Sequence, residues 1–103
     1  MTVRFWALTV TCALLCLPLL AHSSDLYVNK EAAKQGDADA QSNLGLMYAK
    51  SRGVSQDYVQ AHKWFNLAAT RGNSLARENR DVTEKRMTRD QVAKAQKLAR
   101  EWE

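Results

Sequence analysis

The chain contains an internal repeat with a period of 36 residues. The segment that runs from Ala32 to Asn43 returns as the segment from Ala68 to Asn79. The residues that recur unchanged are Ala32, Ala33, Gly36, Ala40 and Asn43, as Ala68, Ala69, Gly72, Ala76 and Asn79. A fixed period in this range is typical of stacked helix–turn–helix units, none of which can bury its apolar face alone. The repeat therefore predicts an all-α array that presents a surface rather than an enclosed active site.

The N-terminal segment does not fit the repeat and has the pattern of an export signal. Arg4 precedes an uncharged apolar run of 17 residues that ends at Ala21, and Ser23 follows as the second small residue of a cleavage site. We expect residues 1–23 to be a signal peptide and residues 24–103 to fold. Because roughly 17–25 apolar residues can span a bilayer, an uncleaved anchor is the alternative. Both interpretations place the domain across the membrane, with a bacterial periplasm first and secretion as another possibility.

The composition argues against several classes of function. Cys12 and Cys16 both lie in the apolar run, so residues 24–103 offer neither a disulfide nor a thiolate metal ligand. The formal charge is +4, but basic and acidic residues alternate between residues 77 and 90. This alternation is typical of solvated helix faces, so we expect no nucleic-acid partner.

His62 is the only histidine within residues 24–103. A metal site or a catalytic triad needs further ligands or a nucleophile beside it, and the sequence supplies no such pattern. We therefore expect no catalytic residue, no metal and no cofactor, and we expect His62 to be exposed to solvent.

Glycines and capping residues divide the chain into five expected helices. They are expected over residues 26–35, 38–50, 58–70 and 74–86, with a last helix that ends at Trp102. Gly36 and Gly72 tolerate the left-handed conformation that ends a helix. The expected N-caps are Asp37, Asp57, Asn73 and Thr88. Gln60 and Gln91 follow two of these caps by three residues, which predicts two capping boxes.

Apolar residues recur at helical spacing on three of these helices. The three buried stripes are expected at Ala40, Leu44, Met47 and Tyr48; at Ala61, Trp64, Phe65 and Ala68; and at Ala95, Leu98, Ala99 and Trp102. We expect Trp102 to seal the last hairpin. Gly45 lies on the first stripe, where glycine costs about 1 kcal/mol relative to alanine. This predicts that another helix backbone passes closely over Gly45.

Residues 36–72 resemble a Sel1-like repeat, an α/α-solenoid relative of the tetratricopeptide repeat. The resemblance rests on Ala40, Leu44, Gly45, Met47, Tyr48, Gly53, Ala61, Trp64, Ala68 and Gly72. It implies a solenoid of about two repeats that acts as an adaptor for other proteins. Residues 73–103 depart from the pattern, since Arg80, Thr83 and Glu84 replace the apolar positions, and are expected to form a polar capping hairpin.

One set of residues recurs outside the buried stripes. The order amide, aliphatic, cation appears at Asn43, Leu46 and Lys50, and again at Asn79, Val82 and Arg86. The helix that carries it lines the concave side of tetratricopeptide-like arrays, so these six residues are a candidate binding strip. The alternative is that Val82 belongs to the core and that the polar residues are ordinary surface.

Three functions are consistent with the sequence. The first is an exported interaction module whose partner is an unknown protein or peptide, or a second copy that stacks on Leu26 and Tyr27. The second is a structural envelope component that associates with itself or is tethered by an uncleaved N-terminal segment, its only expected contact with a membrane. The third and weakest is a small hydrolase acting on a cell-wall or β-lactam-type substrate.

Overall fold

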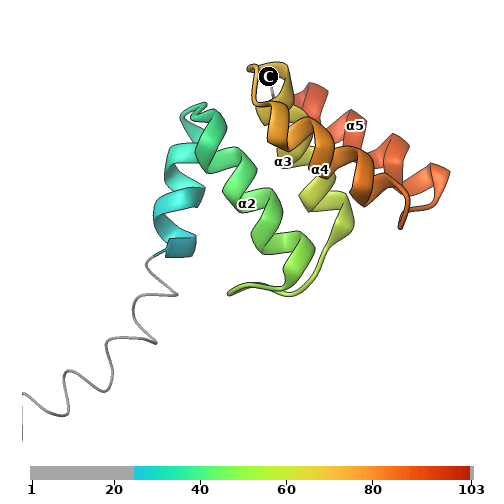
Figure 1. Cartoon of the computed structure of the whole chain (residues 1–103), viewed down its shortest axis with the longest axis horizontal. Helices are drawn as coiled ribbons and strands as arrows, with labels where there is room; N and C mark the ends of the chain where they lie inside the picture. The colour runs from blue at the N-terminus through green and yellow to red at the C-terminus, as the bar shows by residue number, and fades with distance from the viewer. Residues whose placement is uncertain (1–24, 103) are drawn as a thin grey trace, which may run out of the picture.

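The computed structural model describes residues 25–102, and within them every regular element is a helix (Figure 1). The first helix covers residues 25–34, and four more follow: α2 Ala38–Lys50, α3 Tyr58–Thr70, α4 Ser74–Glu84 and α5 Arg89–Trp102. The all-α solenoid prediction is confirmed. Of the described helices, none is both long and apolar enough to cross a membrane. The expected signal peptide or anchor lies outside the described residues.

The local signals in the sequence place most helix boundaries. Both α2 and α3 begin and end at the expected residues. The side chains of Asp37 and Asn73 accept hydrogen bonds from the backbone N–H groups of the third helical residues, at 3.0 and 2.8 Å. Gly36 and Gly72 both have φ +95°, the left-handed conformation expected after a helix.

Two local predictions need correction. The box at Asp57 is only half formed: its carboxylate accepts from the Gln60 N–H, but its own N–H donates to the Tyr48 carbonyl at 3.1 Å and has no need of the glutamine. Helix α4 ends at Glu84 rather than Arg86, because the chain tightens there into turns in which the Arg86 N–H donates to the Thr83 carbonyl at 3.0 Å.

The capping box at the start of α5 is complete. The Thr88 N–H donates to Gln91 Oε1 at 2.9 Å, and the Gln91 N–H donates to Thr88 Oγ1 at 3.2 Å. Replacing Thr88 by alanine is expected to lower the free energy of unfolding by about 1 kcal/mol, measured by urea denaturation. Thr70→Ala is the control, since that hydroxyl only donates to the Asn66 carbonyl within α3. Equal losses in both variants would contradict a capping role.

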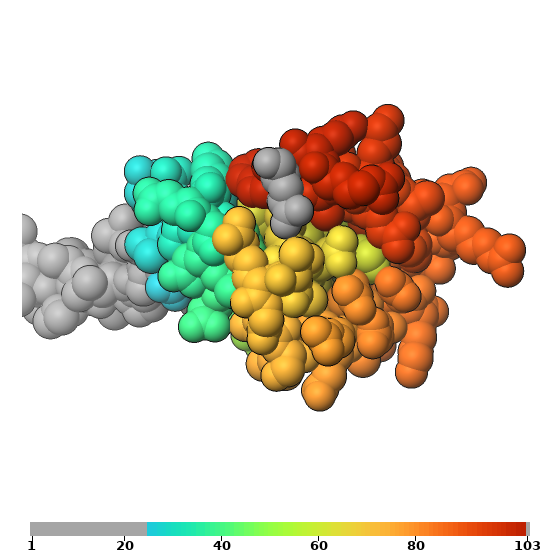
Figure 2. Space-filling model, turned by 90° about the horizontal axis from the view of Figure 1, so that it is seen from above, coloured from blue at the N-terminus to red at the C-terminus, as the bar shows by residue number. Residues whose placement is uncertain are grey.

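Helix α3 is the centre of the fold and packs against α2, α4 and α5. Two apolar clusters meet on it. The larger joins Leu44 and Met47 of α2 to Trp64 and Leu67 of α3, with Ala99 of α5 and Ala33 of the first helix. The smaller contains Ala61, Phe65, Ala68 and Ala76. Figure 2 shows the elements following one another from the first helix at one end to α4 and α5 at the other.

The predicted stripes are largely buried. Ala40, Leu44, Met47, Ala95 and Ala99 are buried, as are all four stripe residues of α3, while Tyr48 and Leu98 are partly buried. Trp102 is 39% exposed and meets Trp64 edge-on, with ring centroids 5.0 Å apart. This contact docks the terminal helix on α3, although part of the Trp102 ring remains exposed.

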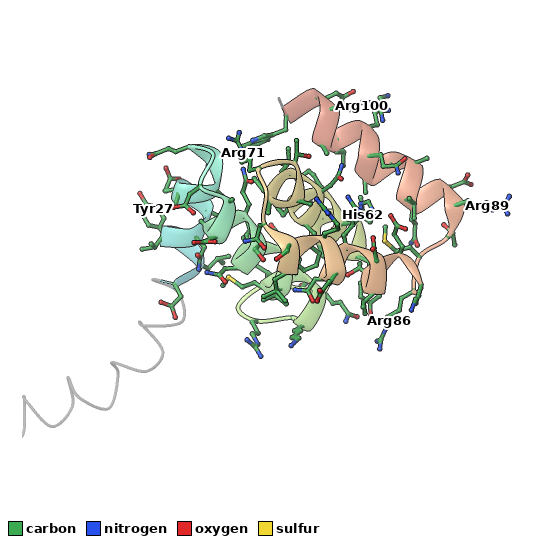
Figure 3. The ribbon with its side chains drawn as sticks, turned by 45° about the horizontal axis from the view of Figure 1, so that its top comes forward. Tyr27, His62, Arg71, Arg86, Arg89 and Arg100 are labelled. Atoms are coloured by element: carbon green, nitrogen blue, oxygen red, sulfur yellow. The ribbon has the colours of Figure 1, made fainter. Side chains whose placement is uncertain are left out.

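The prediction that His62 is exposed is wrong. Its side chain is fully buried and lies among the helices in Figure 3. Its Nε2 lies 2.7 Å from Glu84 Oε1 of α4. The neighbouring Lys63 is also buried, with Nζ 4.3 Å from the centroid of the Trp64 ring. This burial lowers the pKa of Lys63, and the negative charge of Asp57 opposes the shift. Both residues lie off the apolar stripe, but helices pack around α3 on several sides and cover these positions too.

Candidate binding groove between α2 and α4

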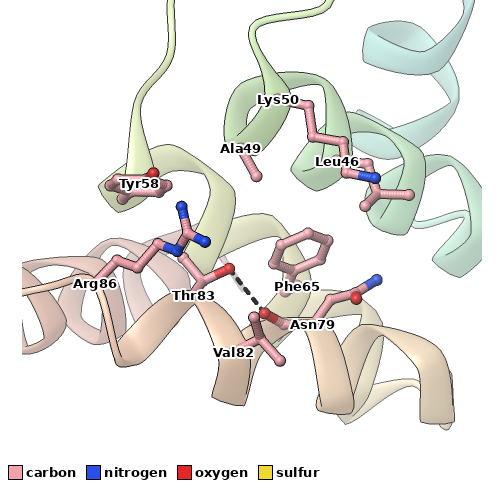
Figure 4. Close-up of a pocket in the computed structure, with 9 residues that line it drawn as sticks. All are labelled: Leu46, Ala49, Lys50, Tyr58, Phe65, Asn79, Val82, Thr83 and Arg86. Carbon is pink, nitrogen blue, oxygen red and sulfur yellow. Dashed lines mark hydrogen bonds between the residues drawn. The ribbon is translucent and has the colours of Figure 1, made fainter.

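A groove runs between α2 and α4, and α3 lies beneath it (Figure 4). It encloses a hollow of about 180 Å³. Its lining residues are Leu46, Ala49, Lys50, Tyr58, Phe65, Asn79, Val82, Thr83 and Arg86. Five of the six residues in the candidate strip therefore face one hollow, since only Asn43 is missing from this set. We call this feature the α2–α4 groove.

The floor of the groove is the ring of Phe65, and Gly45 makes room for it. A Cβ atom built on Gly45 would lie 2.5 Å from Cε1 of that ring, far inside van der Waals contact. The expectation that a helix backbone passes over Gly45 is therefore wrong, because an aromatic side chain fills the space instead. The missing side chain lets the ring lie between α2 and α4, where it is 1% exposed.

The walls of the groove are apolar near the floor. Leu46 and Ala49 come from α2 and pack against the cluster that contains Phe65, while Val82 comes from α4. Val82 is 56% exposed, so the alternative that it belongs to the core is wrong. The buried Thr83 hydroxyl donates a hydrogen bond to the Asn79 carbonyl at 2.7 Å (Figure 4). Its donor is therefore already satisfied within α4.

The charged residues of the groove are all cations. Lys50 is the last residue of α2 and Arg86 follows the end of α4, and both are exposed. Among the ion pairs formed within residues 25–102, none includes either of them. The lining residues include no aspartate or glutamate. The groove therefore combines an apolar floor with a positively charged rim.

A second hollow, of about 280 Å³, adjoins the first and shares Leu46 with it. It is lined by Asp25, Asn29, Asn43, Leu46, Met47, Arg52 and Gly53. Four of these residues stand one 36-residue period before groove residues: Asn29 before Phe65, Asn43 before Asn79, Leu46 before Val82 and Met47 before Thr83. Asn43, the sixth residue of the candidate strip, thus occupies in one repeat the place that Asn79 occupies in the next.

Sequence reasoning missed four lining residues: Ala49, Tyr58, Phe65 and Thr83. Phe65 lies in the core, as its stripe predicts, but its second role as the floor of the groove follows only from the space left at Gly45. Tyr58 is the first residue of α3, and no spacing on its own helix relates it to α2 or α4. The sequence signal that was available, a glycine on an apolar stripe, indicated close packing without indicating which group packs there.

Known proteins share this architecture. Residues 38–73 match the Sel1 repeat family. The structure is similar to the crystal structure of a protective antigen present in uropathogenic Escherichia coli strains, which displays an SLR fold. The match has a TM-score of 0.69 and 41% sequence identity, and it covers 72% of this chain but only 16% of the antigen chain. Residues 38–73 therefore form a Sel1-like repeat.

Proposed function

We propose that this chain is an exported protein–protein interaction module that binds a peptide segment of its partner in the α2–α4 groove. The observation that carries the proposal is the repetition of the lining, since Asn43 and Leu46 face one hollow as Asn79 and Val82 face the next. Each hollow offers an amide that can bond to a peptide backbone and an aliphatic side chain that can be desolvated. A surface with this repeat suits a chain that lies across both hollows.

Export to the periplasm is the second part of the proposal. Its support is the signal-like pattern of residues 1–23. The similar protein of uropathogenic strains is a protective antigen, which accords with a place in the cell envelope. The mass of the protein recovered from an envelope fraction tests this part: a chain that begins near Ser24 has been cleaved, and a full-length chain is anchored or has not been exported.

A noncatalytic role accords with the surroundings of the one histidine in the described residues. His62 forms a pair with Glu84 at 2.7 Å, but the His62 side chain is fully buried. A substrate in the groove would meet Phe65 and the strip residues instead. That the chain is not an enzyme stays a prediction. Its test is the variant His62→Gln, which is expected to capture the partner as well as the unchanged chain does.

The groove is tested by affinity capture from envelope extract with the tagged full-length chain. The variant Asn43→Ala, Leu46→Ala, Lys50→Ala is expected to lose a partner that the unchanged chain retains. Asn43 and Lys50 are exposed, so their two substitutions should each change the free energy of unfolding by no more than about 0.5 kcal/mol. Thermal unfolding of the triple variant checks that the partner is not lost through loss of the fold.

A matched control variant also removes one leucine, one lysine and one amide side chain, but at exposed positions of α4 and α5 outside the groove. Its substitutions are Leu75→Ala, Lys94→Ala and Gln96→Ala. Loss in the groove variant with retention in the control supports the proposal. Retention in all three proteins would keep an interaction module but place its site elsewhere. If nothing is captured, sedimentation should then reveal whether the chain associates with itself, as a structural component of the envelope would.

A further inference from the structure

The two hollows differ in charge although they occupy equivalent places in the repeat. The α2–α4 groove is lined by Lys50 and Arg86 with no acidic residue, whereas the second hollow holds Arg52 together with Asp25. A negative group on a ligand would therefore be attracted to the first hollow and would gain little from the second. The difference gives a bound peptide a preferred place for its charge.

The two cations come from different walls of the groove, and the apolar floor lies between these walls. Figure 4 shows Lys50 on the α2 wall, with its side chain extending toward Leu46, and Arg86 near Tyr58, with the Phe65 ring between the helices. A charge pair formed next to apolar surface is less screened by water than a pair on an open helix face. Because both side chains are exposed and neither belongs to an ion pair within the described residues, both are available to a ligand.

The size of the hollow limits what accompanies the charge. About 180 Å³ leaves room for one large apolar side chain above Phe65, between Leu46 and Val82. In an extended peptide, alternate side chains point to the same side and lie roughly 7 Å apart. An apolar residue and a residue two positions away can therefore enter the groove together, one on the floor and one at the rim.

Resting on the proposed function, we propose that the ligand of the α2–α4 groove is an acidic, extended peptide segment within a partner protein. An apolar side chain of the segment covers Phe65, and an aspartate or glutamate two residues away pairs with Lys50 and Arg86. The carboxylate belongs to a side chain rather than to the end of a chain, because the second hollow continues the surface past Leu46 and lets the peptide run on.

The probe is a random dodecapeptide library displayed inside a surface loop of a carrier protein, so that no peptide has a free C-terminus. It is selected on protein purified from cells that express the full 103-residue chain. We expect enrichment of aspartate and glutamate two positions from a large apolar residue. In a selected peptide, replacing the acid by its amide should weaken binding roughly tenfold or more, since a charge-assisted bond is lost. Rising salt should weaken it further.

Charge reversal on the protein tests the same contact from the other side. Lys50→Glu with Arg86→Glu should abolish binding of the selected acidic peptides. The control Arg89→Glu with Lys94→Glu changes the net charge equally, at two positions of α5 that do not line the groove, and should leave binding within about twofold. Circular dichroism of both double variants checks that the helices are retained.

The outcomes separate this inference from the proposed function. Peptides that show no acidic preference and still bind after the reversal of Lys50 and Arg86, but are lost in the variant Asn43→Ala, Leu46→Ala, Lys50→Ala, would overturn the acidic ligand and keep the groove as a binding site. Peptides that bind equally to groove and control variants, or a library that yields no binder, would overturn both. Selection of acidic peptides that are lost on reversal at the groove alone supports both.

Discussion

Replacing Phe65 by alanine is expected to lower the free energy of unfolding by about 3–5 kcal/mol. The side chain is 1% exposed and joins α3 to Ala76 of α4 and to Leu46 of α2, so its removal leaves a cavity where three helices meet. A domain of this size has a total stability of only about 4–12 kcal/mol, at roughly 0.05–0.15 kcal/mol per residue. The substitution should therefore remove a large part of the stability and leave a fraction of the chain unfolded.

Urea denaturation followed by circular dichroism measures this loss. Tyr27→Ala is the control, because this aromatic side chain is 67% exposed and should change stability by no more than about 0.5 kcal/mol. Phe65→Leu keeps most of the volume and should fall between the two. If Phe65→Ala costs no more than Tyr27→Ala, the ring does not form the buried floor described here.

Most helix boundaries could be predicted because their causes are local. Asp37, Asn73 and Thr88 each accept a hydrogen bond from a backbone N–H only three residues away. Both partners of each bond therefore lie within four consecutive residues of the sequence. The end of α4 could not be predicted in the same way. Its last turn tightens at Thr83, with no glycine to mark the change.

The groove was predictable on the two helices that repeat and not on the third. The period of 36 residues relates Leu46 to Val82 and Lys50 to Arg86. The sequence alone therefore indicates that the two members of each pair occupy equivalent places in successive repeats. Tyr58 and Phe65 lie on α3, the second helix of the hairpin, whereas the candidate strip lies on the first helix. Their place depends on how three helices pack, which is a property of the tertiary structure.

The buried polar residues of α3 show the same limit. A stripe at helical spacing predicts one buried face, but α3 has neighbours on several sides, and His62 and Lys63 are buried beyond the stripe. His62 is tolerated there because Glu84 provides a partner at 2.7 Å, a contact that spans 22 residues of sequence. The residue pattern of α3 alone does not predict that Glu84 of α4 is the partner of His62.

Replacing Gly45 by leucine is expected to destabilise the domain by about 1–3 kcal/mol through overpacking. Even the first added carbon would lie 2.5 Å from the Phe65 ring, which is buried and cannot swing into solvent. Leucine also has a helix propensity about 1 kcal/mol better than glycine, so the observed loss is what remains after this gain. Urea denaturation again measures the change.

A double-mutant cycle shows whether the ring is the cause of that loss. Gly45→Ala and Phe65→Leu each disturb the contact alone, but together they replace a ring and a gap by a methyl group and a smaller side chain. The combined variant should therefore lose less stability than the two single variants do in sum, by about 0.5 kcal/mol or more. Additive losses would mean that Gly45 is required for another reason. A stabilising Gly45→Ala would show that helix propensity outweighs the contact, and the floor of the groove would then not depend on this glycine.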